Sequence, residues 1–265
     1  MSPTHSSTLY LGELFGVEGR VAALTGAGGH LVGEMARAVA RAGMKVAVLD
    51  SRLAKAEAVA AGIREAGGVA IPLEVDVRHR LHFDRALQEI LREFGRLDCV
   101  LNGAGINAPT PFFDITVDEW NDIFQVQLTG TMLGCQVFGR HLVDQGRGSI
   151  INISSASSGP PLSRAFTYSA AKAAIKNLSQ NLAREWAPYN VRVNALRPGF
   201  FPTEWSMQHF ITKERESAIL GHTPMQRYGR PEELVGAVIW LFSDAASFVT
   251  GAEIEVDGGF TAMTI

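Results

Sequence analysis

Cysteines are few in this sequence, and neither a signal peptide nor a membrane-spanning segment is recognisable in it. The chain of 265 residues has only two cysteines, Cys99 and Cys135. Because one falls in what reads as a buried strand and the other in a long apolar helix, structural thiols in a reducing compartment are expected rather than a disulfide framework. The stretch from Met1 to Gly16 lacks the basic region and the uninterrupted apolar core of a signal peptide. No run reaches the ~18 consecutive apolar residues of a membrane span, so we expect a cytoplasmic protein without a membrane partner.

An excess of charge of either sign is also missing. The net charge is -3, and no cluster of Lys and Arg stands out. Because a nucleic-acid partner requires a basic surface, we expect none. The seven histidines show no His-Glu-x-x-His spacing, and no paired-Cys spacing appears, so we predict no catalytic metal. The serines lack a credible histidine base in the sequence, which disfavours a hydrolase.

Repeats, low-complexity tracts and Pro/Ser-rich linkers are absent as well, which favours one domain. We expect residues 1–18 to form an N-terminal leader and 19–265 to form that domain. Short runs rich in Val, Ile and Leu alternate with helical patterns, which is typical of an α/β Rossmann fold. In that fold a doubly wound parallel sheet, here of about seven strands, has helices on both faces and binds ligands at the carboxyl ends of its strands. The expected strands are 20–25, 45–50, 69–75, 97–101, 148–154, 191–196 and 252–256.

Tyr168 and Lys172 stand four residues apart in a segment that reads as helix. Residues at this spacing share one helix face, so their side chains can meet. An ordinary tyrosine has a pKa near ~10, and a cation close by favours the phenolate. Tyr168 is therefore a candidate acid/base, although Tyr-x-x-x-Lys also occurs by chance as a surface tyrosine with a solvated lysine.

A glycine-rich turn from Thr25 to His30 joins the first strand to the helix that follows. Backbone N–H groups and the positive helix end can approach a pyrophosphate at such a turn. Asp50 ends the next strand, where a carboxylate can bind both ribose hydroxyls of adenosine and would repel a 2'-phosphate. This favours NAD over NADP, with Arg52 as the counter-argument. Asp76, just past the third strand, reads equally as a contact for the adenine amino group and as a helix or turn cap.

The stretch from Pro198 to His222 is irregular but rich in large apolar side chains, which an exposed loop rarely carries. We expect it to form a lid over the substrate at about 200–222. A piece of an oligomer interface is the alternative. The side chains that suggest a lid are Phe200, Phe201, Trp205, Met207, His209 and Phe210.

Several motifs in this order and spacing resemble the short-chain dehydrogenase/reductase family, from about Gly19 to Gly259. They are Thr25-Gly26, Asp50, Asn102-Gly103-Ala104-Gly105, Ser155, Tyr168, Lys172, Pro198-Gly199 and Asp257-Gly258-Gly259. The resemblance implies hydride transfer between a nicotinamide and a secondary alcohol or ketone carbon. It implies that Ser155 hydrogen-bonds the reacting oxygen and that Tyr168 exchanges the proton. Lys172 would lower the pKa of Tyr168 and hold the nicotinamide ribose.

The same resemblance implies a homotetramer, or a homodimer, in which the helices at 117–144 and 165–187 pack across subunits. The cofactor-binding residues implied by the resemblance and the glycine turn are Gly26, Gly28, Gly29, His30, Leu31, Asp50, Asp76, Val77, Asn102, Ala104, Gly105, Tyr168, Lys172, Pro198, Gly199, Phe201 and Thr203.

Two positions depart from the family pattern. The family usually has Thr-Gly-x-x-x-Gly-x-Gly, but His30 and Val32 occupy the places of the last two glycines. We hypothesise that the turn is re-registered, with Gly29 approaching the phosphate and Gly33 serving helix packing. Gln127 replaces an Asn that in relatives supports a water linking the lysine to solvent, so we count it with the catalytic residues and expect reduced turnover. This change also leaves open a non-catalytic dinucleotide-binding sensor.

Segments 102–107, 168–175, 198–204 and 222–225 are similar to a branch of D-mannonate oxidoreductases (fructuronate reductases) and, more loosely, gluconate 5-dehydrogenases. A small sugar acid or polyol is therefore the expected substrate. Its carboxylate requires a cation, for which Arg164 is the first candidate and His222 a weaker one. The alternative for Arg164 is a surface arginine. A 3-oxoacyl-carrier-protein reductase, or another carbonyl reductase, is the competing activity. The expected substrate contacts are Ser155, Asn107, Arg164 and Tyr168.

Overall fold

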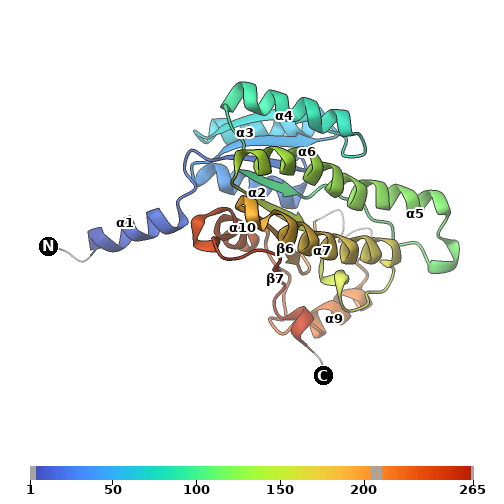
Figure 1. The fold of residues 1–265 in the computed structure, drawn as a ribbon. Coiled ribbons are helices and arrows are strands. Elements are labelled where there is room, and N and C mark those ends of the chain that lie inside the picture. Colours follow the sequence, from blue (N-terminus) through green and yellow to red (C-terminus); the bar gives the residue numbers. More distant parts are fainter. Residues whose placement is uncertain (1–3, 204–206, 208–210, 264–265) are drawn as a thin grey trace.

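Seven parallel strands form one sheet in the order β3-β2-β1-β4-β5-β6-β7 (Figure 1). The computed structural model describes residues 4–203, 207 and 211–263. The chain moves outward from β1 through β2 to β3, and then returns to the other side of β1 with β4. This reversal is the topological switch point of a doubly wound sheet. The strands are β1 Val21–Thr25, β2 Lys45–Asp50, β3 Val69–Glu74, β4 Cys99–Asn102, β5 Gly148–Ile153, β6 Val191–Pro198 and β7 Glu253–Val256.

Helices cover both faces of the sheet because side chains alternate along each strand. In β1, Ala22 and Leu24 pack in one apolar cluster with helices α2, α3 and α10. Val21 and Ala23 pack in the other cluster with α4, α6 and α7. The longer helical elements are α1 Thr4–Phe15, α2 His30–Arg41, α3 Leu53–Glu65, α4 Arg80–Phe94, α5 Val117–Phe124, the π-helix η2 Gln125–Thr129, α6 Gly130–Gln145, α7 Phe166–Trp186, α9 Lys213–Gly221 and α10 Val235–Phe242.

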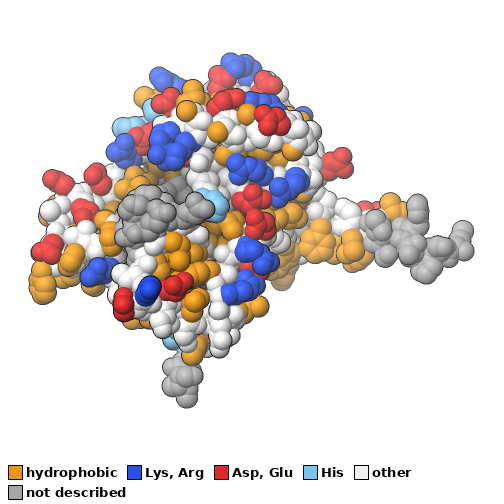
Figure 2. All heavy atoms as spheres, turned by 180° about the vertical axis from the view of Figure 1, so that it is seen from behind, with side chains coloured by type: hydrophobic (Ala, Val, Ile, Leu, Met, Phe, Trp, Pro, Cys, Tyr) orange, Lys and Arg blue, Asp and Glu red, His pale blue; other side chains and the backbone are white. Residues whose placement is uncertain are grey.

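The predicted α/β Rossmann fold is confirmed, and each predicted strand is present with ends that differ by at most two residues. A π-helical segment at η2 interrupts the helix expected at 117–144, and the apolar periodicity did not predict it. The expected leader contains a helix, α1, which projects away from the body of the domain (Figures 1 and 2). Its Leu9, Tyr10 and Leu11 are exposed.

Within the described residues, no helix has both the length and the apolar character needed to cross a membrane. No group of three or more His, Cys, Asp or Glu side chains there is arranged to hold a metal ion. Cys99 and Cys135 are free and buried, and burial raises the pKa of each thiol to about 12. Both side chains therefore pack as small apolar groups rather than as nucleophiles.

Candidate active site

Ser155, Tyr168 and Lys172 come together at the carboxyl end of β5. Ser155 follows this strand and begins a short 3-10 helix, where its Oγ accepts a hydrogen bond from Ser157 N at 3.2 Å. Tyr168 lies in the first turn of α7, and its side chain hydrogen-bonds with that of Ser155. Lys172 follows one turn later, with its Nζ 5.5 Å from the centroid of the Tyr168 ring. The helical spacing thus produces the predicted cluster.

Burial controls the protonation of this pair. Lys172 is buried, and desolvation lowers its pKa to about 7. Burial raises the pKa of Tyr168, and the hydrogen bond with Ser155 only partly opposes that change. The role expected of Lys172, lowering the pKa of the phenol, stays a prediction. Lys172 Nζ donates to Ile153 O at 2.7 Å and faces the ring of Tyr168.

Gln127 is buried in the π-helical segment η2, behind the turn that follows β4. Its Nε2 donates to Ile106 O at 2.7 Å, and a Cβ on Gly105 would come within 2.8 Å of the same amide. Its backbone carbonyl accepts from Thr131 Oγ1 at 2.7 Å. A π-turn offsets the helix hydrogen bonds by one residue, which is common at functional sites. Gln127 therefore supports the turn that borders the cofactor cleft, and its role in a proton relay stays a prediction.

A cleft of about 520 Å³ lies along the carboxyl ends of β1 to β4. At its floor, the turn after β1 approaches the turn after β4 so closely that a Cβ on Gly26, whose φ is +72°, would lie 2.7 Å from Ala104 Cα. Thr25 Oγ1 accepts from Gly103 N at 3.0 Å and joins the two turns. The predicted cofactor residues that line the cleft are Gly26, Gly29, His30, Leu31, Asp50, Asp76, Val77, Ala104, Gly105 and Thr203.

The start of α2 fits a pyrophosphate. Gly29 is the N-cap, and no side chain accepts a hydrogen bond there, so the first backbone N–H groups of the helix have no partner within it. Such groups and the positive helix end favour an anion. His30 is exposed at the first helical position. A Cβ on Gly33 would lie 3.0 Å from Ala27 O, a close contact that agrees with the helix-packing role hypothesised for this glycine.

Two carboxylates border the cleft at the carboxyl ends of β2 and β3. Asp50 is 7% exposed and accepts from Gly28 N at 3.1 Å and from Arg52 N at 3.0 Å, so it is held against the glycine turn. Asp76 accepts from Arg78 Nη2 at 2.6 Å and from Arg78 N at 3.0 Å. The hydrogen bond from the Arg78 side chain is the main cause that lowers the pKa of Asp76 to about 2. Asp76 therefore caps a turn and also lines the cleft.

Some predicted cofactor residues lie elsewhere. The side chain of Asn102 is buried and donates to Asn152 Oδ1 at 2.9 Å, and Asn152 in turn donates to Ser179 Oγ at 2.9 Å. Asn102 thus begins a buried polar chain from β4 through β5 to α7. Phe201 lines a separate small pocket beside β7 and would collide with a Cβ on Gly229. The other predicted residues that do not line the cleft are Gly28, Tyr168, Lys172, Pro198 and Gly199.

The two predicted substrate residues outside the catalytic cluster lie on loops. Asn107 is exposed in the loop after β4, and Arg164 is exposed with a φ of 54° in the loop before α7. Arg215 Nη2 of α9 donates to Ser163 O at 3.3 Å, which links the expected lid to that loop. His222 packs edge-on against Phe260, with ring centroids 4.9 Å apart. The lid residues Glu204, Trp205, His209 and Phe210 lie outside the described residues.

Sequence reasoning missed a buried ionic network behind Ser155. Glu253 Oε1 accepts from Ser154 Oγ at 2.8 Å and from Ser158 Oγ at 3.1 Å. Its other oxygen pairs with Lys176 Nζ at 2.9 Å and with Arg197 Nη1 at 3.4 Å. The sequence offered one signal for this network, the two glutamates at alternating positions of the last strand, Glu253 and Glu255. Nothing in the sequence indicated which cations they would contact.

Comparisons with known proteins agree with this site. Residues 31–261 match a family model described as enoyl-(acyl carrier protein) reductase. The uncharacterized oxidoreductase UxuB of Bacillus subtilis (strain 168) is 39% identical, over 92% of this chain and 95% of the relative. The 5-keto-D-gluconate 5-reductase of Escherichia coli (strain K12) is 31% identical, over 94% of this chain and 98% of the relative.

Solved structures of related dehydrogenases are also similar to this chain. A gluconate 5-dehydrogenase from Burkholderia cenocepacia J2315, in complex with NADP and tartrate, has a TM-score of 0.91 and 32% identity, covering 95% of this chain and 99% of that chain. A Haemophilus influenza protein with bound NAD, described as a D-mannonate oxidoreductase, has a TM-score of 0.88 and 33% identity, covering 94% and 97%.

The fold and the site define a dinucleotide-binding oxidoreductase of the Rossmann class. More specifically, the chain belongs to the short-chain dehydrogenase/reductase family, as its motifs predicted. Its relatives include enzymes named for gluconate, ketogluconate and threitol.

Proposed function

We propose that this protein transfers a hydride between NAD(H) and a secondary alcohol or ketone carbon of a sugar acid or polyol. The observation that carries the proposal is the cluster of Ser155, Tyr168 and Lys172 beside a cleft bordered by Asp50. The names of the relatives support the substrate class, since they include a gluconate 5-dehydrogenase and a D-threitol dehydrogenase. The resemblance to the mannonate branch supports a sugar acid.

The nicotinamide would supply or accept the hydride when bound, and the chain's own residues would handle the proton. In the oxidative direction, Ser155 and Tyr168 hydrogen-bond the hydroxyl of the substrate, and the proton passes to the Tyr168 oxygen as hydride leaves the carbon. Tyr168 must be deprotonated to accept it, and burial opposes this ionisation. Lys172, where protonated, would favour the phenolate electrostatically. In the reductive direction the same phenol donates its proton to the carbonyl oxygen.

Asp50 is the basis for proposing NAD. A 2'-phosphate on the adenosine ribose would approach its carboxylate, which is 7% exposed and fixed by Gly28 N. Such a like-charge contact is costly in a partly desolvated site. Arg52, whose side chain is 66% exposed, is the residue that could instead pair with a 2'-phosphate. Relatives are known with each cofactor, because one neighbour binds NADP and another binds NAD.

A coupled comparison of substrates and cofactors tests the proposal. Production of NADH or NADPH would be measured with aldonic acids, polyols and 3-hydroxyacyl thioesters, each with NAD and with NADP. We expect turnover with NAD and an aldonic acid or polyol, and a loss of orders of magnitude in Tyr168→Phe with NAD affinity within a few-fold. Preference for the thioester would favour the competing carbonyl reductase. NAD binding without turnover on any substrate would favour a dinucleotide-binding sensor.

We also propose a cytoplasmic homotetramer, with a homodimer as the alternative. Exposed apolar side chains beside α5 and α7 support association, since Phe113 is 98% exposed, Val117 74% and Phe166 44%. Large exposed apolar patches commonly mark interfaces. Light scattering of the purified chain would measure the mass directly.

A further inference from the structure

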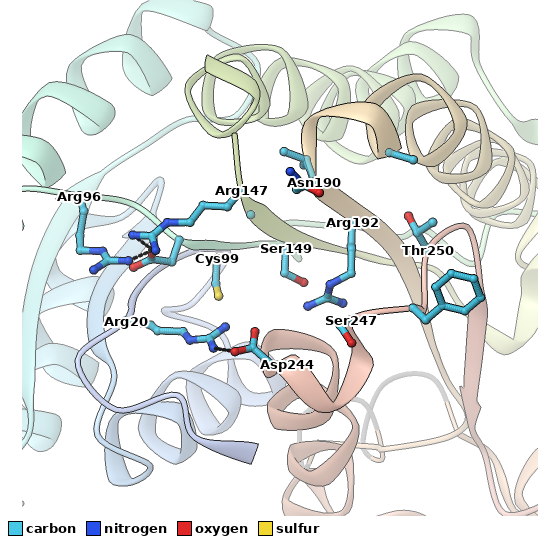
Figure 3. Close-up of a pocket in the computed structure, with 15 residues that line it drawn as sticks. Arg20, Arg96, Cys99, Arg147, Ser149, Asn190, Arg192, Asp244, Ser247 and Thr250 are labelled. Atoms are coloured by element: carbon cyan, nitrogen blue, oxygen red, sulfur yellow. Dashed lines mark hydrogen bonds and ion pairs between the residues drawn. The ribbon is translucent and has the colours of Figure 1, made fainter. Parts of the chain in front are cut away.

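A second cavity, of about 670 Å³, opens on the edge of the sheet opposite to the catalytic cluster. We name it the basal cavity. It lies at the amino ends of β1, β4, β5 and β6, and its wall includes residues from the turns that lead into these strands (Figure 3). Its size is in the usual range for small-molecule sites. The residues that form it and enter the argument are Arg20, Arg96, Asp98, Arg147, Arg192 and Asp244.

Positive charge exceeds negative charge around the basal cavity. Four arginines line it, against two aspartates. Arg96 and Arg147 share the single carboxylate of Asp98, and Arg147 reaches it only at 3.7 Å. One oxygen of Asp98 is also occupied by Val21 N, at 2.9 Å. Two guanidinium groups thus compete for one carboxylate that is already partly satisfied.

Arg20 and Arg192 face the same space from the other wall (Figure 3). Arg20 pairs with Asp244 at 2.7 Å. Arg192 donates to Leu241 O at 2.7 Å and to Ser243 O at 3.2 Å, and no ion pair within the described chain includes it. Its Nη1 is buried without a hydrogen-bond partner. Burial lowers the pKa of Arg192, and the charge of Arg20 adds to this effect.

Helix capping accounts for part of this arrangement. Arg20 Nη1 donates to Phe242 O at 2.9 Å, so Arg20 and Arg192 both satisfy carbonyls at the end of α10. Cations are favourable at a helix C-terminus. Capping does not neutralise the charge, however, and it does not involve Arg96 or Arg147. An excess of two positive charges therefore faces the cavity.

We propose that the basal cavity binds a dianionic phosphate group, either free phosphate or a small phosphate ester. Planar guanidinium groups bind phosphate oxygens through paired, charge-assisted hydrogen bonds. A phosphate monoester carries close to two negative charges at neutral pH, which matches the excess of arginine over aspartate. Arg147 has a side chain that is 60% exposed and only a long ion pair, so it can turn to the ligand at little cost.

Calorimetric titration tests the site directly, with inorganic phosphate and a sugar phosphate as probes in a phosphate-free buffer of constant ionic strength. We expect saturable binding of both probes. In Arg147→Ala the dissociation constant should rise about tenfold, the effect of losing one charge-assisted contact. Because Arg147 lies far from Tyr168, on the opposite edge of the sheet, turnover should not change.

Matched variants separate the basal cavity from other basic sites. Arg92→Ala removes an exposed guanidinium on α4, with a side chain that is 72% exposed, and should leave binding unchanged. Arg52→Ala alters the cofactor cleft and should also leave it unchanged. If Arg52→Ala abolished binding while Arg147→Ala did not, the phosphate would occupy the cofactor cleft and the proposal would be wrong. The proposal would also be wrong if chloride displaced the phosphate probe as effectively as phosphate itself does, because the cavity would then bind any anion. The absence of binding at about 10 mM phosphate would overturn it as well.

Binding of only one probe would identify the source of the phosphate. Saturation by the sugar phosphate, with no heat from inorganic phosphate, would assign the cavity to an ester. A second variant, Arg192→Met, retains an unbranched apolar stem while removing the partly buried charge, and its folding would be checked by circular dichroism. It should weaken phosphate binding at least as much as Arg147→Ala, and normal binding in a folded Arg192→Met protein would contradict the proposal.

Discussion

Glu253 offers the sharpest test of what holds the catalytic serine in place. Its side chain is 8% exposed and bonds four groups, namely the hydroxyls of Ser154 and Ser158 and the cations Lys176 and Arg197. Glu253→Gln retains the shape of the side chain but removes its charge. The 6%-exposed side chain of Arg197 would then depend on Glu255 Oε1, at 2.8 Å, as its remaining carboxylate.

The expected loss of stability follows from this burial. Removing one partner of a buried ion pair usually costs about 3–5 kcal/mol, because the other charge is left without compensation. Arg197 retains Glu255, and glutamine retains one acceptor oxygen, so we expect a value near ~3 kcal/mol. For a protein of this size that corresponds to a melting temperature lower by about 6–12 °C.

Chemical and thermal denaturation of Glu253→Gln and of Glu255→Gln would measure this effect. Glu255 pairs with the same arginine, but its side chain is 44% exposed, so its loss should cost at most about 1 kcal/mol. If the melting temperature fell equally in the two variants, the view that burial determines the loss of stability would be refuted. Because Glu253 holds the serines on either side of Ser155, kcat should also fall in Glu253→Gln, with little change in NAD affinity.

The pH dependence of this difference has a definite sign. Burial alone would raise the pKa of Glu253, but hydrogen bonds from Lys176 and Ser154 and the charge of Arg197 outweigh it, so the net pKa is lowered. A carboxylate with a lowered folded-state pKa stabilises the protein above the ordinary glutamate pKa of about 4.3 and loses that contribution as pH falls through the folded value. The difference in the free energy of unfolding between wild type and Glu253→Gln should therefore be largest at neutral pH and decrease in acid.

Three further predictions concern the cleft and the cluster. Asp50→Ala should raise the ratio of kcat/KM with NADP to that with NAD by about tenfold or more, as steady-state kinetics with both cofactors would show; an unchanged ratio would mean that Asp50 does not select NAD. Lys172→Met should have a larger free energy of unfolding than wild type near pH 6. This difference should decrease as pH rises from about 7, the pKa of buried Lys172, toward the ordinary lysine pKa of about 10.4. The reason is that folded wild type binds fewer protons than its unfolded chain in that interval, so wild type gains stability as pH rises. A constant advantage in denaturation curves would contradict this burial effect. Arg164→Ala should raise KM for a sugar acid about tenfold but leave KM for an uncharged polyol unchanged, and the exposed Arg92→Ala serves as its control.

The elements of the fold could be predicted because each depends on local pattern. Apolar runs mark the buried strands, glycines mark the turns, and the four-residue spacing of Tyr168 and Lys172 determines that they share a face. The family motifs added Ser155, which neither spacing nor composition would have selected. The cleft beside Asp50 followed from the rule that ligands bind at the carboxyl ends of parallel strands.

What could not be predicted depends on contacts between distant segments. Burial raises the pKa of Tyr168, and the bond that Lys172 donates to Ile153 O is one that no sequence spacing indicates. The apolar periodicity around Gln127 did not indicate the π-helical turn there. The basal cavity assembles arginines from three turns and from the start of β6, and evenly scattered charges in the sequence gave no sign of it.

The hydrogen-bonded path from Asn102 through Asn152 to Ser179 bears on how such an enzyme can change its substrate. Asn102 ends the strand that leads into the cofactor turn, and Ser179 lies two turns beyond Lys172 on α7. Since buried amide contacts of this kind are costly to break, turn and helix are expected to move as one rigid frame. Variation in substrate preference would then arise in the segments outside that frame, the loop at 159–165 and the segment at 200–222 that we expect to form a lid, while the proton-transfer geometry stays unchanged.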